Sequence, residues 1–95
     1  MAIQSFRSDR ARAIFDGRDP GKGFPSDLIR TTKRKLEMLE ATPTLDALRL
    51  PPNNRLEALK GDRAGWFSIR VNDQFRLVFR WTSGGPAEVD FVGYH

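Results

Sequence analysis

The chain has 95 residues, with 16 lysines or arginines against 12 aspartates or glutamates, and a formal net charge of +4. This length suffices for one modest hydrophobic core, so we expect a single domain over residues 1–95 and not a two-domain enzyme with an enclosed cleft. There is no cysteine and one histidine. A disulfide framework and a thiolate metal site are therefore excluded, and we expect neither a metal nor another cofactor.

The hydropathy pattern gives no sign of a membrane protein. No apolar run approaches the roughly 20 residues that span a bilayer, and residues 1–6 lack the apolar region of a signal peptide. We therefore expect a soluble, cytoplasmic protein. Most of the basic residues are arginines, which bind phosphate and carboxylate in a planar, bidentate manner. RNA, DNA and an acidic protein are the candidate partners, although solvated surface arginines remain an alternative.

The amino-terminal part of the chain predicts one strand and one helix. Residues 2–6 are a candidate for a short strand, with Ile3 and Ser5 on one side and Gln4 and Phe6 on the other. Ser8 is a suitable helix N-cap, and Asp9 would lie in the first turn. Gly17 is suited to the position just beyond a helix end. The sequence therefore predicts a helix between Ser8 and Gly17.

A second helix is predicted between Pro25 and Pro43. Its less polar residues recur at helical spacing: Leu28, Ile29, Thr32, Leu36 and Leu39. Pro43 ends it, because the residue before a proline is disfavoured in the helical conformation. Its outer face is expected to carry four basic residues: Arg30, Lys33, Arg34 and Lys35.

The periodicity changes to that of strands in the second half of the chain. Residues 66–71, 74–81 and 87–92 predict three strands. The pair Asn72-Asp73 suits a hairpin turn between the first two. The prediction is an α+β domain, in which two N-terminal helices pack on a small, twisted, mainly antiparallel sheet.

One face of this sheet is expected to be basic. Alternate side chains of a strand share a face, so Arg70, Arg76 and Arg80 should point away from the apolar face that meets the helices. Lys60 lies in the loop that leads into this surface. The alternative is an ordinary solvated sheet face, on which arginine is common.

The only tyrosine and the only histidine, Tyr94 and His95, follow the last predicted strand after one glycine, Gly93. Histidine titrates near neutrality, and tyrosine can stack on a base or donate a proton. Together with Lys60 and the arginines, they would supply phosphate binding, charge stabilisation and proton transfer, as metal-free RNA cleavage requires. A chain end whose polar residues simply face water is the alternative.

Four segments of the second half follow one another in a distinctive order and spacing: Leu-Glu-Ala-Leu-Lys-Gly-Asp (56–62), Gly-Trp-Phe-Ser-Ile-Arg-Val-Asn (65–72), Phe-Arg-Leu-Val-Phe (75–79) and Val-Asp-Phe-Val-Gly-Tyr-His (89–95). They resemble the HigB-type toxins of the RelE-like superfamily, and residues 3–6 fit as well. The resemblance covers nearly the whole chain and implies the RelE-like microbial RNase fold.

The resemblance also implies a function. Such toxins belong to bacterial type II toxin–antitoxin modules and are ribosome-dependent mRNA endoribonucleases, or mRNA interferases. They cleave translated mRNA in the A site and so inhibit translation and growth. A HigA-type helix-turn-helix antitoxin neutralises them, and operator DNA would be reached only through that antitoxin.

In the family pattern, the catalytic positions fall on Lys60, Arg76, Tyr94 and His95. Lys60 and Arg76 would hold the scissile phosphate, Tyr94 would stack on a base or orient the phosphate, and His95 would act as general acid or base. RNA phosphates are expected to contact three further arginines: Arg63, Arg70 and Arg80.

Two positions depart from the family pattern. A family aspartate before Tyr-His is replaced by Gly93, and a family histidine in the loop is replaced by Glu57. Glu57 is an alternative general base. These losses motivate a rival prediction, a catalytically weak module that binds RNA or the ribosome and blocks translation without cutting. A third prediction is a partner subunit whose basic face only binds an acidic antitoxin segment.

Overall fold

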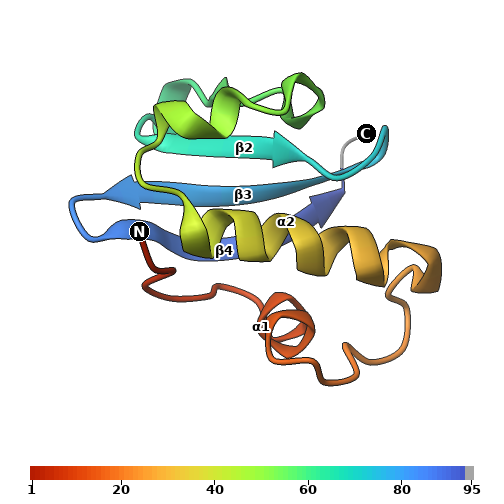
Figure 1. The fold of residues 1–95 in the computed structure, drawn as a ribbon. Coiled ribbons are helices and arrows are strands. Elements are labelled where there is room, and N and C mark those ends of the chain that lie inside the picture. The colour runs from red at the N-terminus through yellow and green to blue at the C-terminus, as the bar shows by residue number, and fades with distance from the viewer. Residues whose placement is uncertain (94–95) are drawn as a thin grey trace.

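The computed structural model describes residues 1–93 and shows an α+β arrangement of two α-helices and one antiparallel sheet (Figure 1). The main elements are α1 (Asp9–Phe15), α2 (Ile29–Ala41), β1 (Glu57–Ala58), β2 (Trp66–Arg70), β3 (Phe75–Thr82) and β4 (Gly85–Gly93). The predicted α+β class is thus confirmed. Within the described part of the chain, no helix is long and apolar enough to cross a membrane.

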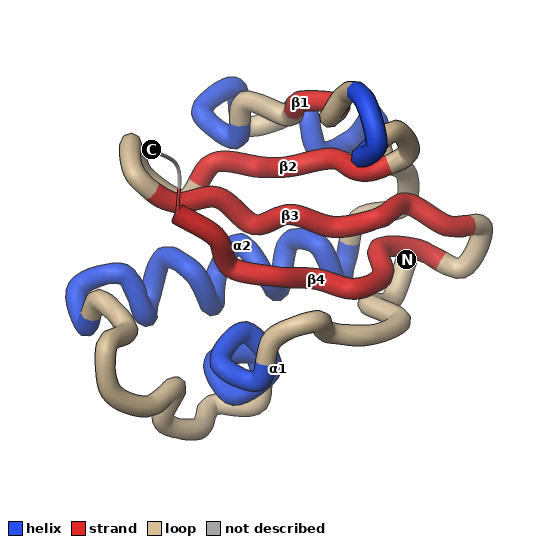
Figure 2. The backbone as a smooth tube through the Cα atoms, turned by 180° about the vertical axis from the view of Figure 1, so that it is seen from behind, coloured by secondary structure: helices blue, strands red, loops and turns tan. Residues whose placement is uncertain are grey.

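The sheet has the strand order β1-β2-β3-β4, and each neighbouring pair is antiparallel. Helix α2 lies across one face, and α1 lies beside α2 on the β4 side (Figures 1 and 2). Seen from behind in Figure 2, the strands lie in front of α2 and no α-helix covers them. The sheet therefore has an inner face against the helices and an outer face that no α-helix of residues 1–93 covers.

The hydrophobic core lies between α2 and the inner face of the sheet. Alternate residues of β2, β3 and β4 meet both helices there. The residues of this core that are at most 1% exposed include Ile14, Leu36, Leu39, Ile69, Leu77, Phe79, Val89 and Phe91. The alternation of the strands and the helical spacing of α2 predicted this packing, because each pattern places its apolar residues on one side.

Substitution of Phe79 by alanine is expected to lower the free energy of unfolding by about 3–5 kcal/mol, since the ring is 0% exposed and its removal leaves a cavity. Denaturant unfolding measures this loss. Leu50→Ala is the matched control, because Leu50 is 70% exposed and should change stability little. Equal effects of the two substitutions would contradict this placement of the core.

Both helix boundaries follow from local chemistry. The Ser8 hydroxyl accepts a hydrogen bond from the Ala11 amide at 3.2 Å and caps α1. Gly17 follows that helix with φ +78°, a left-handed conformation that costs glycine least. Helix α2 is preceded by the 3-10 turn Ser26–Leu28 and ends where Thr42 becomes extended before Pro43. The predicted helices are confirmed.

The predicted strand at residues 2–6 is wrong. This segment runs beside β4 but makes only a single parallel bridge, between Phe6 and Val89. Backbone bonds join Gln4 N to Pro86 O at 2.8 Å and Arg7 N to Val89 O at 2.9 Å. The reason is a bulge in β4: the register with β3 shifts between Val78 and Arg80, and Glu88 has φ 52°. A bulged edge cannot support a regular ladder along its whole length.

The prediction that Lys35 lies on the outer face of its helix is also wrong. Lys35 is 5% exposed, and its ammonium donates a hydrogen bond to the side-chain oxygen of Asn54. The pKa of Lys35 is lowered by burial first, and then by the nearby charges of Arg34 and Arg70. The cause is non-local, because the segment after α2 folds back over this side of the helix.

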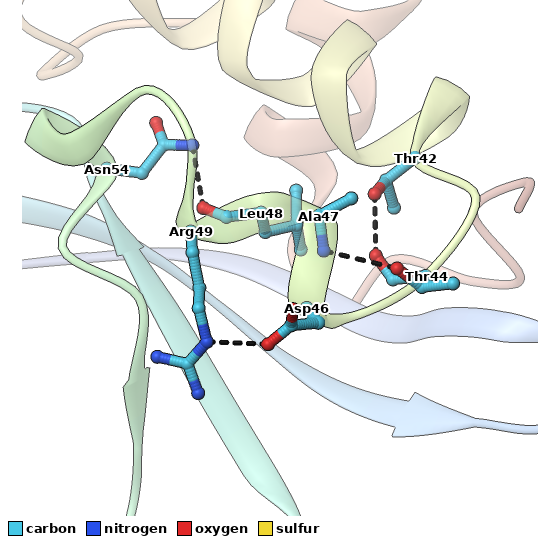
Figure 3. Close-up of polar contacts among 7 residues, drawn as sticks. All are labelled: Thr42, Thr44, Asp46, Ala47, Leu48, Arg49 and Asn54. Atoms are coloured by element: carbon cyan, nitrogen blue, oxygen red, sulfur yellow. Dashed lines mark hydrogen bonds and ion pairs between the residues drawn. The ribbon is translucent and has the colours of Figure 1, made fainter.

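That returning segment is held by its own polar contacts (Figure 3). Asn54 donates to the Leu48 carbonyl at 3.0 Å, and Arg49 pairs with Asp46 at 2.6 Å. Asn54 is itself 0% exposed. A buried amide satisfied on both sides fixes the path of the chain into β1, and this path positions the candidate site.

Candidate functional site

A cavity of about 480 Å³ opens on the outer face of the sheet. A turn after β1, the middle of β3 and the carboxyl end of β4 surround it. Its lining residues are Leu59, Lys60, Asp62, Arg63, Val78, Val92 and Gly93. The cavity thus brings the Lys60 loop to the carboxyl end of β4.

Lys60 is held over the sheet by backbone bonds on both sides of it. Before it, the Leu59 amide donates to the Trp66 carbonyl at 2.8 Å. After it, Gly61 begins the 3-10 turn Gly61–Arg63, in which the Arg63 amide donates to the Lys60 carbonyl at 3.3 Å. The Lys60 side chain itself is exposed. A fixed backbone therefore presents an accessible ammonium at the rim of the cavity.

Arg76 faces the outer side of β3, as predicted, but it does not stand on an open surface. It is 7% exposed. Its Nε donates to the Ser68 hydroxyl at 2.8 Å, and one Nη donates to the Arg55 carbonyl at 2.6 Å. The guanidinium is therefore part of the packing at this end of the sheet. The physical reason is that the chain entering β1 crosses this end of the sheet and covers the guanidinium.

Glu57, the alternative base, is a neighbour of Arg76. It pairs with Ser68 across β1 and β2, and its carboxylate oxygen lies 3.9 Å from a guanidinium nitrogen of Arg76. The Glu57 side chain is 51% exposed, against 8% for Arg76. The carboxylate is thus accessible to a substrate, whereas the guanidinium lies beneath it.

Arg70 and Arg80 are both neutralised by carboxylates. Arg70 donates to Asp73 in the hairpin turn, and this hydrogen bond, followed by the Arg70 charge, lowers the pKa of Asp73. Arg80 donates to Glu88 at 3.0 Å. Arg63 differs from both, because within residues 1–93 it has no ion pair. Of the three predicted phosphate contacts, Arg63 alone also lines the cavity.

Two predicted catalytic residues, Tyr94 and His95, lie outside the described residues. The residue before them, Gly93, lines the cavity and pairs with Phe75 across β3 and β4. Among the described residues, no group of three or more histidines, aspartates or glutamates is arranged to hold a metal ion. The positive charge at this site comes from Lys60 and Arg63.

The sequence reasoning did not single out Arg7 or Trp66. The Cζ atoms of Arg7 and Arg63 each lie 5.8 Å from the centre of the Trp66 ring. Trp66 shares the outer face with Ser68 and Arg70 by strand alternation, so this pattern could have drawn attention to it. Arg7 gave no such signal, because its contact depends on the path of residues 4–7 beside β4.

The sequence matches a known protein family over nearly its whole length. Residues 4–95 match a protein family described as the RelE-like toxin of the type II toxin–antitoxin system HigB. The chain therefore belongs to the HigB-like toxin family, and the sequence resemblance is confirmed. Its two helices and four-stranded antiparallel sheet are compatible with a RelE-like fold.

Individual relatives carry related names. The chain is 50% identical over 61 residues to Toxin HigB-1 of Vibrio cholerae, covering 64% of this chain and 64% of that protein. It is 25% identical over 93 residues to Endoribonuclease HigB of Proteus vulgaris, covering 98% and 99%. It is also 36% identical over 78 residues to an uncharacterized protein of Haemophilus influenzae, covering 82% and 77%.

Proposed function

We propose that this protein is the toxin of a type II toxin–antitoxin module and acts as a ribosome-dependent mRNA endoribonuclease that cleaves translated mRNA in the A site. Family membership supports the class, as does the name of the Proteus vulgaris relative. The observation that carries the proposal is the cavity in which Lys60, Arg63 and the end of β4 meet. Cleavage of a phosphodiester requires a positively charged site with a proton-transfer group beside it.

The proposed reaction is metal-independent attack of an RNA 2′-hydroxyl on the adjacent phosphate. A general base takes the proton of the 2′-hydroxyl as its oxygen bonds to phosphorus, and negative charge builds on the phosphate oxygens. The bond to the 5′-oxygen of the next nucleotide then breaks, a general acid protonates that oxygen, and a 2′,3′-cyclic phosphate remains. Lys60 stabilises the developing charge from the cavity rim. Arg76 acts from beside the cavity. Val78 and Val92 line the cavity, and Val92 is the cross-strand neighbour of Arg76.

In the proposed mechanism, His95 carries out proton transfer. His95 follows Gly93 closely and serves as general acid or base, and Tyr94 stacks on a base or orients the phosphate. Glu57 is the alternative base, because its carboxylate is exposed and lies near Arg76. Gly93 provides no carboxylate of its own at the position where related toxins carry an aspartate.

The cavity is open and lined by few residues, so it cannot enclose a strand of RNA. The proposal therefore gives the ribosome the task of presenting the mRNA in a fixed, splayed conformation. Binding to the ribosome would use the net charge of +4, which attracts RNA phosphates. The proposed site of action is the cytoplasm. The proposed antitoxin is a helix-turn-helix protein of the HigA type, through which alone the toxin would reach operator DNA.

The test compares translated and free RNA. Purified protein is added to ribosomes stalled with a defined A-site codon, and new 5′ ends are mapped on the mRNA. We expect cleavage within or beside that codon, and little cleavage of the same RNA without ribosomes. Efficient cutting of free RNA at the same positions would contradict the ribosome dependence.

One observation favours a second function, a module that blocks the A site without cutting. The loss of the family aspartate at Gly93 removes one proton-transfer group. This function is distinguished in the same experiment, because blocking would halt translation and leave no new 5′ ends. Gly93→Asp should then introduce cleavage where the wild-type chain shows none.

A further inference from the structure

Trp66 lies on the outer face of the sheet, apart from the hydrophobic core. It is the first residue of β2 and the cross-strand partner of Arg80. Its neighbour Phe67 faces the core, where it stacks on Phe79 with ring centres 6.5 Å apart. Trp66 is only partly buried. Part of an aromatic side chain is thus accessible on the same face as the cavity.

Two exposed arginines contact this ring from different parts of the chain. Arg7 comes from the segment beside β4 and Arg63 from the turn after Lys60, and each Cζ lies 5.8 Å from the ring centre. Within residues 1–93 neither of them has a carboxylate partner. By contrast, Arg80 beside the ring is engaged with Glu88 at 3.0 Å. The two guanidiniums at the ring therefore keep their charge available for an anion.

This aromatic and basic group adjoins the cavity. Arg63 belongs to both, because it lines the cavity and contacts the Trp66 ring. The Trp66 carbonyl also accepts the amide of Leu59, the residue before Lys60. If an RNA phosphate lies at Lys60, the neighbouring nucleotide of the RNA would lie at the Trp66 ring.

We propose that Trp66, Arg7 and Arg63 form a nucleotide-binding platform, on which a base of single-stranded RNA stacks while the arginines hold its phosphates. An aromatic ring beside unpaired arginines is the combination that binds single-stranded nucleic acid without strong sequence preference. The inference rests on the proposed function, because it places this nucleotide next to the one cleaved. The positive charge also suits an acidic protein segment, but such a segment has no base to stack on the ring.

The test measures binding separately from cleavage. The full chain is titrated against a fluorescent, single-stranded oligoribonucleotide whose 2′-hydroxyls are methylated, so that it cannot be cut. Trp66→Leu is expected to weaken binding by about 5- to 100-fold, and Trp66→Tyr by about 3-fold or less, because tyrosine keeps a stacking face. An RNA that lacks bases cannot stack on the ring. Its affinity for Trp66→Leu should therefore equal its affinity for the wild-type chain.

Matched arginine variants test the charged part of the platform. Arg7→Ala and Arg63→Ala should weaken binding and reduce its salt dependence by about one phosphate contact each. Arg12→Ala is the control. Arg12 belongs to α1, and its Cζ lies 5.7 Å from the centre of the Phe6 ring in a similar contact, but neither residue lines the cavity. Melting curves of all variants accompany the titrations. If Trp66→Leu folds poorly, equal binding of abasic and base-containing RNA by the wild-type chain would still overturn the stacking.

Several results would overturn the inference. These are wild-type affinity in a folded Trp66→Leu variant, equal losses for Arg12→Ala and Arg7→Ala, or no binding of the RNA by the wild-type chain. Loss of antitoxin binding with RNA binding unchanged would assign the surface to a protein and would equally overturn it. A chain that binds RNA through Trp66 but never cleaves mRNA would support the platform while the proposed cleavage failed.

Discussion

Replacement of Lys60 by alanine is expected to lower the single-turnover rate of mRNA cleavage on programmed ribosomes by about 100- to 1000-fold, the usual cost of removing one preorganised charge donor. Lys60 is exposed at the rim of the cavity, and backbone bonds to Trp66 and from Arg63 fix its position. Solvent does not supply a positive charge at this position, so the developing phosphate charge would lose the stabilisation that the ammonium gives. The expected loss is therefore in the chemical step.

The measurement must exclude a loss of folding or of general charge. The melting curve of Lys60→Ala should match that of the wild-type chain, because the side chain packs against little. Lys22→Ala is the matched control, since Lys22 is an exposed lysine in the loop between α1 and α2. A Lys60→Ala rate within a few-fold of that control would remove Lys60 from the mechanism.

Replacement of Arg76 by alanine is expected to lower the free energy of unfolding on the order of 3 kcal/mol, and to reduce cleavage as well. The 7% exposed guanidinium donates to Ser68 and to the Arg55 carbonyl, and both acceptors would lose their partner. The segment entering β1 would lose an anchor, and Lys60 follows that segment. Arg76 is thus expected to matter for structure and for activity together.

Arg80→Ala is the control for this variant. It removes an arginine from the same strand and the same face, but from a side chain that is 48% exposed. An exposed ion pair of this kind contributes about 1 kcal/mol or less. Urea unfolding of both variants gives the comparison. A fully stable Arg76→Ala variant without cleavage activity would show that Arg76 acts only in the chemistry.

Periodicity predicted a large part of this fold correctly. The alternation of β2 and β3 placed Arg70, Arg76 and Arg80 on one face, and the structure pairs Arg70 directly with Arg76. Ser8 and Gly17 predicted the two ends of α1, and Pro43 predicted the end of α2. Such patterns are local, and they report which side of an element a residue occupies.

Periodicity could not predict which polar residues would be covered. Lys35 and Arg76 are both buried by the chain between α2 and β1, whose path depends on contacts far apart in sequence. Arg70 pairs with Asp73 in a turn, and Arg80 pairs with Glu88 in the bulge of β4. The apolar and polar alternation of the strands does not reveal either feature. The contacts of Trp66 with Arg7 and Arg63 require three separate segments to meet.

The bonds between residues 4–7 and β4 have a further consequence for the free protein. β4 runs over Gly85–Gly93, and its outer edge would otherwise present unpaired backbone groups to other chains. Residues 4–7 occupy that edge through Pro86 and Val89. The opposite edge of the sheet is β1, which has only two residues. Short or covered edges offer little template for edge-to-edge pairing. Strand exchange between copies is thus disfavoured by the backbone itself, whether or not a partner covers the outer face.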